Sequence, residues 1–379
     1  DTGCVEFIGE TQYHTFAHFY AHDEFARQVK EHAARLKALF GKKPTTFLNA
    51  ELIYNNDLSV LLSRLGFKAA LSEGVDQILG WRSANYAYAP ISAPDMRLFL
   101  RNRSLSEDVY RRFSDRSWSE WPLTAEKYAG WCAALEGKAD ILNIFWGARA
   151  FGLLNPAETG VFAFLEALPK ALLDRGCTFI TPREACRRLP ARDTIDVPQA
   201  ISRDANAADL SAWLGNNTQK DAVHALYDLS DRMAKIRNPE MLRDFGRLQT
   251  TDHFLNMSTK WFTQTLADRP NPFESPYDAY IVYMNVLADF SLRLAAVEKA
   301  ASESAGMKTA RKTAAKTPSA KAQTQKTKAP GATKSAPSAA TSTKRGKAAA
   351  GEAGRDSAKK PGKTAGSRAK SAKKAKDED

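Results

Sequence analysis

Short apolar runs alternate with amphipathic helical stripes over residues 1–190, and this alternation constrains the fold more than any other feature of the chain. The runs at Val5–Ile8, Thr45–Leu48 and Phe67–Leu71 predict strands. The stripes at Asp23–Phe40 and Leu58–Leu65 predict helices between them. Parallel strands joined by crossover helices produce this order. The sequence therefore predicts an α/β fold for its N-terminal half.

Later segments continue the same pattern. Thr181 and Glu184 have the spacing of a capping box, and Pro182 stands at the first helical position, so a helix is expected to begin there. Three further strands and one further helix are predicted in this half: Arg97–Leu100, Ile141–Phe145 and Phe179–Ile180 as strands, and Thr124–Leu135 as a helix.

Strand signals disappear after residue 200, and apolar residues then recur at helical spacing. Predicted helices cover 219–235, 239–248, 251–266 and 276–298. From residue 301 the chain contains no aromatic residue and cannot bury enough apolar surface to offset chain entropy. We therefore expect three parts: an α/β domain at 1–195, a helical domain at 196–300 and a disordered tail at 301–379.

The charge of the chain is concentrated in the tail. Residues 301–379 carry 20 lysine and arginine residues against 6 acidic ones, whereas residues 1–300 carry 35 against 37. In composition this Lys/Ala/Pro-rich tail resembles the arms of linker histones, which neutralise phosphates without sequence preference. The sequence favours a polyanion-binding tail and a solubilising spacer equally.

Several features bear on where the chain works. No run of consecutive apolar residues reaches the length of a membrane span, and the start has no signal pattern, which favours a cytoplasmic protein without membrane contact. The four cysteines lack metal or redox spacing and are expected to be buried free thiols. Because Val5–Ile8 reads as a strand already under way, we expect upstream strands to be missing.

Glu51 is the clearest chemical signal, because it stands where an apolar strand gives way to a polar turn. The carboxyl ends of parallel strands face the active site in barrels of this type. Its neighbours Asn49, Tyr54 and Asn55 are hydrogen-bonding groups that suit sugar hydroxyls. A structural role for Glu51 as a cap or an ion pair is the alternative.

Five separated segments, in order, resemble glycoside hydrolase family 57 in its α-amylase-like branch: Glu10–His14, Asn49–Asn56, Trp118–Lys127, Leu248–Phe254 and Glu274–Ala279. The resemblance extends from residue 1 to about 295. It implies an incomplete (β/α)7 barrel followed by a helical domain. It also implies a retaining mechanism on an α-glucan or maltooligosaccharide, without a cofactor or a metal ion.

The resemblance places Glu51 at the position of the nucleophile. Phe151 and Gly152 set the register of a later segment, so the acid/base aspartate of the family falls on Gly147. A glutamate of the family falls on Arg149; if this arginine points toward Glu51, its charge should hold that carboxylate ionised, and a salt bridge can form. Hydrolysis is then expected to be weak or lost, since glycine can neither donate nor accept a proton.

The same resemblance assigns substrate contacts to the histidines and acids within its motifs, and aromatic side chains there suit the apolar faces of pyranose rings. The alternative for the histidines and aromatics is a structural role in the core. Glu120 is also the best substitute for the missing acid/base. The predicted substrate-binding residues are His14, Tyr54, Glu120, Trp121, Asp252 and His253. Two alternatives stay open: a non-catalytic glucan-binding or regulatory protein, and a polyanion- or nucleic-acid-associated protein that acts through its tail.

Overall fold

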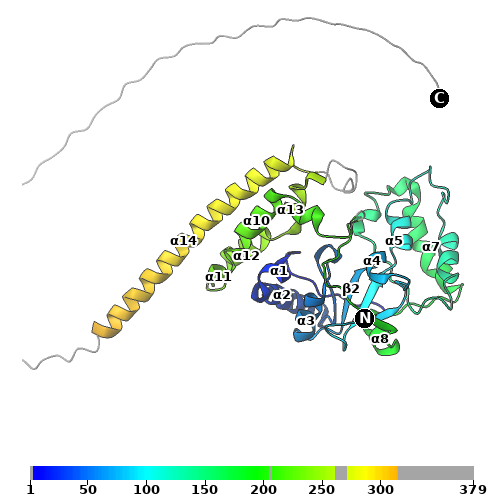
Figure 1. Ribbon diagram of the computed structural model, residues 1–379, viewed down its shortest axis with the longest axis horizontal. Helices are drawn as coiled ribbons and strands as arrows, with labels where there is room; N and C mark the ends of the chain where they lie inside the picture. Colours follow the sequence, from blue (N-terminus) through cyan, green and yellow to red (C-terminus); the bar gives the residue numbers. More distant parts are fainter. Residues whose placement is uncertain (1–2, 205–206, 261–270, 315–379) are drawn as a thin grey trace, which may run out of the picture. The chain divides into compact units, whose positions relative to one another are not determined.

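The computed structural model describes residues 3–204, 207–260 and 271–314 (Figure 1). By its internal contacts the chain divides into two compact units, Asp1–Lys316 and Thr317–Asp379. The α/β and helical parts expected at 1–195 and 196–300 thus lie within one unit. The predicted disorder of the tail beyond residue 314 concerns residues outside the described ranges.

The described strands form one five-stranded sheet in the order β1-β2-β4-β3-β5. The pairs β1 with β2, β2 with β4 and β3 with β5 are parallel, and β3 with β4 is antiparallel. The mixed α/β class is therefore confirmed, although this sheet has fewer strands than the seven of the expected barrel. The strands are β1 (Thr46–Leu48), β2 (Ala69–Glu73), β3 (Ala87–Pro90), β4 (Arg97–Arg101) and β5 (Asp193–Ile195).

Three of the predicted strands do not form. Val5–Ile8 is irregular, and only Gly9 beyond it forms a parallel bridge, to Phe47. Ile141–Phe145 runs beside the end of β4 but forms no ladder with it. Asn143 joins the two segments: its side-chain amide donates to Leu100 O at 3.0 Å, and its carbonyl accepts from Asn102 N at 2.8 Å. Phe179–Ile180 is also irregular. Conversely, two short strands were not predicted. Strand β3 ends in a proline, and strand β5 begins with the exposed residues Asp193 and Thr194, so neither has a clear strand pattern.

The α/β part is built around eight helices and three 3₁₀ turns. Gly41, with φ of 75°, ends α2 directly after the predicted stripe 23–40. The capping box before α8 is confirmed, with Thr181 and Glu184 bonding each other's backbone. The N-cap of α3 is Asn55, whose side chain accepts from Leu58 N at 3.0 Å. The elements are α1 (Ala17–Tyr20), α2 (His22–Phe40), η1 (Ala50–Leu52), α3 (Asn56–Arg64), α4 (Asp76–Leu79), α5 (Arg103–Tyr110), α6 (Ala125–Ala133), η2 (Ala148–Ala150), η3 (Ala157–Thr159), α7 (Val161–Leu173) and α8 (Pro182–Arg188).

The helical part follows the predicted pattern with three changes. The stripe at 219–235 is split between α10 and α11, and α13 ends at Asn256, well before 266. The last helix continues past residue 301 to Ala314, which corrects the start of the predicted disordered tail. Alanine, methionine, lysine and arginine are strong helix formers, which favours the continuation of the helix. The elements are α9 (Ser211–Leu214), α10 (Asn217–Tyr227), α11 (Ser230–Met233), α12 (Pro239–Leu248), α13 (Thr251–Asn256) and α14 (Pro276–Ala314).

Helix α14 lies alongside α10 and α12 (Figure 1). Its Tyr280 hydroxyl donates to Asp221 at 2.5 Å, and its Tyr283 hydroxyl donates to Leu248 O at 3.0 Å. The part Pro276–Glu303 is long and apolar enough to cross a membrane by length and composition. The sequence does not contain this candidate as a continuous apolar run, because polar residues interrupt it. One such helix is weak evidence for a membrane protein, since a core helix of a soluble protein passes the same test.

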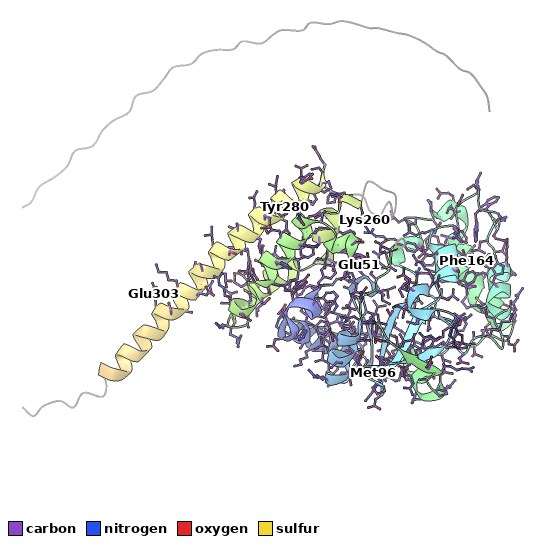
Figure 2. All side chains as sticks on the ribbon, in the orientation of Figure 1. Glu51, Met96, Phe164, Lys260, Tyr280 and Glu303 are labelled. Atoms are coloured by element: carbon purple, nitrogen blue, oxygen red, sulfur yellow. The ribbon has the colours of Figure 1, made fainter. Side chains whose placement is uncertain are left out.

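The largest hydrophobic cluster joins the α/β and helical parts, which explains why they form one unit. Phe16 packs against both Trp213 and Phe254 in it. Figure 2 marks Met96 in this cluster and Phe164 in a second one around α6 and α7.

The prediction of four buried thiols is wrong for Cys4, which is exposed because it precedes the first strand contact. Cys132 is buried, and Cys177 and Cys186 are half-buried.

Candidate active site

Glu51 lies in the turn η1 that directly follows β1, at the carboxyl end of the strand as predicted. Glu51, Leu52 and His14 have φ values of 56°, 54° and 57°, and they are three of the four non-glycine residues with positive φ in the described ranges. A left-handed conformation costs about 1–2 kcal/mol for such residues. Backbone strain of this kind concentrates at functional sites, and all three residues line one pocket.

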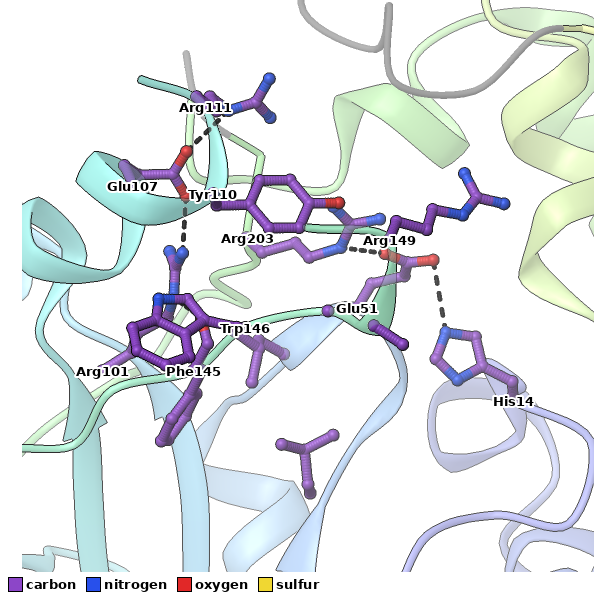
Figure 3. A pocket seen from close by; sticks show the side chains of 14 residues that line it. His14, Glu51, Arg101, Glu107, Tyr110, Arg111, Phe145, Trp146, Arg149 and Arg203 are labelled. Atoms are coloured by element: carbon purple, nitrogen blue, oxygen red, sulfur yellow. Dashed lines mark hydrogen bonds and ion pairs between the residues drawn. The ribbon is translucent and has the colours of Figure 1, made fainter. Parts of the chain in front are cut away.

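This pocket has a volume of about 470 Å³, within the usual range for small-molecule sites. Its wall brings together Glu51, His14, Gly147 and Arg149, four residues that the sequence analysis selected, and Figure 3 shows the side chains gathered around Glu51. The prediction that the strand end at Glu51 and the segment at Gly147 face one site agrees with this arrangement.

The Glu51 carboxylate is almost completely buried, with a side-chain exposure of 1%. Its Oε2 accepts a hydrogen bond from Arg203 Nε at 2.5 Å, and its Oε1 lies 3.3 Å from both His14 Nε2 and Thr251 Oγ1. Burial acts to raise the pKa of Glu51, but attraction to Arg203 and the bond from His14 outweigh it and hold the pKa well below its usual range. Glu51 is therefore ionised, as a nucleophile must be, while both its oxygens are engaged.

Glu51 pairs with Arg203 and with His14, and Arg203 is not among the residues expected at the site. Arg203 also donates its backbone N–H to Glu51 O at 3.0 Å. It therefore holds the backbone of the strained turn and also neutralises the carboxylate. Arg149 lines the same pocket. No local sequence signal marks Arg203; the only available clue was that a buried carboxylate requires a countercharge. Thr251 belongs to a quoted motif, but the residues predicted from that motif to bind substrate are its neighbours Asp252 and His253.

His14 links two carboxylates. Its Nδ1 bonds Glu10 Oε1, and its Nε2 faces Glu51. Burial acts to lower the pKa of His14, but the bonds to Glu10 and Glu51 outweigh it and raise the pKa to about 9. At neutral pH the ring is therefore an imidazolium whose protons are held by its partners.

This raised pKa predicts how stability depends on pH. His14 stabilises the fold fully below its ordinary pKa of 6.5, and this contribution is lost as pH rises through about 9. Because the side chain is 37% exposed, we expect a loss of about 1–2 kcal/mol between these values, measured by urea unfolding. The variant His14→Gln should not show this loss. His253→Gln is the matched control, and equal pH dependence in both variants would contradict the assignment.

Gly147, to which the resemblance assigns the acid/base position, lies close to Tyr110. A Cβ added there would lie 3.3 Å from Tyr110 Cε2 and 3.7 Å from its hydroxyl oxygen. Tyr110, from the end of α5, thus occupies the space into which an aspartate side chain would extend. No sequence signal marks this approach, because Tyr110 ends α5 and belongs to none of the quoted motifs.

The other carboxylate in the described wall of the pocket is Glu107. It accepts from Arg101 Nη2 and from Arg111 Nε, both at 2.6 Å. Burial acts to raise the pKa of Glu107, but these arginines outweigh it and lower the pKa. Both described carboxylates of the pocket are therefore ionised at neutral pH.

Two predicted stacking residues lie away from this pocket. Tyr54 is 1% exposed and packs in the main hydrophobic cluster, so it presents no ring face to a sugar. Trp121 is 42% exposed, but its ring faces the guanidinium of Arg116 at 5.6 Å and does not line the pocket.

Three predicted polar contacts also lie elsewhere. Glu120 pairs with Lys127 at 2.7 Å and is absent from the pocket wall, as is Asp252 on α13. His253 Nε2 lies 3.1 Å from Arg247 O, and its ring borders a separate cavity of about 110 Å³ beneath α14. Within the described ranges no cluster of three His, Cys, Asp or Glu side chains is arranged to hold a metal ion.

Comparison with known proteins agrees with this fold. The profile of glycosyl hydrolase family 57 matches residues 1–198, and the chain belongs to this family. A protein of Methanocaldococcus jannaschii named "Putative alpha-amylase" is 38% identical over 303 residues, which cover 76% of this chain and 64% of the relative. The match therefore spans less than two thirds of that relative.

Solved structures of the family share the fold. The family 57 branching enzyme of Thermococcus kodakaraensis has a TM-score of 0.57 at 16% identity, over 76% of this chain and 66% of that one. The branching enzyme of Pyrococcus horikoshii has a TM-score of 0.53 at 15% identity, over 74% and 63%. At these identities the similarity establishes the fold alone.

Proposed function

We propose that the chain binds an α-glucan in the Glu51 pocket and cleaves unactivated glucan weakly or not at all. The observation that carries this proposal is the pairing of an ionised Glu51 with a glycine at the acid/base position, in a wall whose described carboxylates are both ionised. The names of the amylase and the branching enzymes in the same family support an α-glucan as the ligand.

The chemistry explains why cleavage is expected to be slow. A retaining enzyme needs a nucleophile and a second group that protonates the leaving oxygen, and this protonation contributes about 10²–10⁴-fold. Arg149 carries a permanent charge and cannot supply the proton. The protons of His14 are bound by Glu10 and Glu51. Glu120 lies outside the wall, which argues against it as the substitute.

The proposal predicts a large difference between substrates. An α-maltosyl fluoride needs no protonation of its leaving group, so we expect it to react at least about 10²-fold faster than maltotriose. Maltotriose should nevertheless bind measurably in calorimetry. Gly147→Asp should reduce the difference between the two reaction rates by less than about tenfold, because its Cβ would contact Tyr110. Rapid maltotriose hydrolysis that is lost in Glu51→Gln would refute the proposal.

A second candidate function rests on the basic tail. The excess of 20 basic over 6 acidic residues from residue 301 supports non-specific binding of nucleic acid or another polyanion. Retention of the full chain on DNA should fall steeply between 50 and about 200 mM salt, and deletion of residues 317–379 should remove it. Retention that survives the deletion would exclude the tail as its cause.

A further inference from the structure

Trp81 is the most exposed large hydrophobic side chain in the described part of the chain, with an exposure of 93%. It stands in the turn between α4 and β3, and no aromatic ring or cation of the described residues stacks on its indole. A single exposed apolar residue is common on protein surfaces. Trp81 differs from such a residue because the turn that carries it is held in one conformation.

The turn is closed by the side chain of Arg82. Its guanidinium donates to Ile78 O and to Thr194 O, both at 2.8 Å, and to Leu79 O at 3.0 Å. These three carbonyls belong to α4 and to β5, so one side chain ties both elements to the residue that follows Trp81. A loop without such bonds would let the ring fold back onto the surface.

Both ends of the turn are fixed as well. Gly80 has φ of 59° and ψ of −120°, a conformation that a residue with a side chain rarely adopts. The side chain of Asn85 accepts from Asn102 Nδ2 at 2.9 Å, and its carbonyl accepts from Ile141 N at 3.1 Å. Trp81 is therefore preorganised in solvent, which reduces the entropy cost of binding a ligand.

The turn lies at the carboxyl edge of the sheet, which also carries Glu51. Helix α4 follows the carboxyl end of β2, and β2 is parallel to β1, which precedes Glu51. A Cβ added to Gly74 would lie 2.5 Å from Arg101 O and 2.9 Å from Ala84 Cβ, so the turn approaches the backbone of a residue in the pocket wall. Trp81 itself is not part of that described wall.

The surroundings of Trp81 favour a sugar over a protein partner. A stable protein interface needs about 800 Å² on each side and an apolar core. The exposed residues before Trp81 are instead Asp76, Gln77 and Gly80, and Ser83 follows it with a hydroxyl group. A pyranose places its C–H groups on an aromatic face and its hydroxyls at the rim, where amides, carboxylates and hydroxyls can bond them.

We propose that Trp81 is a surface platform that binds a glucose unit of a long α-glucan outside the Glu51 pocket. The ligand class is taken from the proposed function, so this inference rests on it. The inference adds a second point of contact at the same edge of the sheet. A glucan long enough to engage both the pocket and the platform gains avidity, because the second contact becomes intramolecular.

The test compares the full chain with its variants Trp81→Ala and Trp81→Phe. Affinity electrophoresis through gels that contain soluble amylose should show binding at least about fivefold weaker for Trp81→Ala, and Trp81→Phe should keep part of the affinity. The affinity for maltotriose, measured by calorimetry, should stay within about twofold of wild type because the pocket is a separate site.

The matched control is Phe179→Ala, which removes another exposed aromatic ring, with an exposure of 62%. It should bind amylose as the wild type does. The midpoint of urea unfolding should be unchanged in all variants, since the removed rings lie in solvent. The basic tail is the same in every variant, so a difference that depends on Trp81 reports on the platform.

The outcomes separate this inference from the proposed function. Equal amylose binding by Trp81→Ala and wild type would overturn the platform, and maltotriose binding would then still support the pocket. An equal fall for maltotriose would place the ring in the primary site and overturn a separate platform. Absence of binding for both ligands in the wild type would overturn both proposals. Self-association that is lost in Trp81→Ala, without an effect on amylose, would assign the ring to contact between copies and overturn the inference.

Discussion

Replacing Glu51 with glutamine is expected to reduce covalent labelling by an α-maltosyl fluoride by at least about 10³-fold. The wild-type carboxylate is ionised and lines the pocket, so it can attack a sugar whose leaving group needs no proton. Glutamine keeps the shape of the side chain and removes the nucleophile. Intact-mass spectrometry would detect the glycosyl adduct, and peptide mapping would locate it.

The matched control is Glu107→Gln, which changes the other described carboxylate of the same wall. Its labelling should stay within about threefold of the wild-type rate, because Glu107 is not at the strand end that carries the nucleophile. An adduct on another residue would refute the role of Glu51. Measurable maltotriose binding without any adduct on the wild-type protein would favour a non-catalytic glucan-binding protein.

Removing the guanidinium of Arg203 should have the largest effect on stability. Arg203→Met leaves Glu51, which is 1% exposed, without the cation at 2.5 Å. Breaking a buried pair costs about 3–5 kcal/mol, and the 30% exposure of Arg203 places the expected loss near about 3 kcal/mol at pH 7. Urea unfolding followed by tryptophan fluorescence would measure it.

Two comparisons make this result specific. Adding Glu51→Gln to Arg203→Met should recover much of the loss, because the uncompensated charge is then gone. Arg192→Met, which breaks an exposed pair with Asp140, should cost less than about 1 kcal/mol.

The lowered pKa of Glu51 means that its ion pair stabilises the fold above an ordinary carboxyl pKa of about 4.3, so the penalty of Arg203→Met should shrink as pH falls below that value. A penalty that is independent of pH would contradict the pairing.

Local sequence rules predicted the elements that local physics determines. Gly41 ends α2 and Thr181 caps α8 because their conformations and bonds depend on a few neighbouring residues. The position of Glu51 after β1 also followed from the order of the strands. Its place in a pocket with Gly147 and Arg149 was expected from the family resemblance and not from local rules.

The rest of the site depends on contacts between residues far apart in the chain. Arg203 reaches Glu51 across 152 positions and Thr251 reaches it across 200, and neither contact leaves a periodic signal. Tyr54 stands in the quoted motif, yet the path of the chain buries it in the core. Motif membership therefore located the site, but it did not decide which side chains face its interior.

The origin of the partners of Glu51 has a consequence for how this protein can be divided. Its countercharge and its threonine donor both follow residue 198, where the family match ends. A shortened protein that stopped at that boundary would keep the acidic side chain and His14 but lose the guanidinium and the threonine hydroxyl that also hold it. The helical region is thus a structural part of the site.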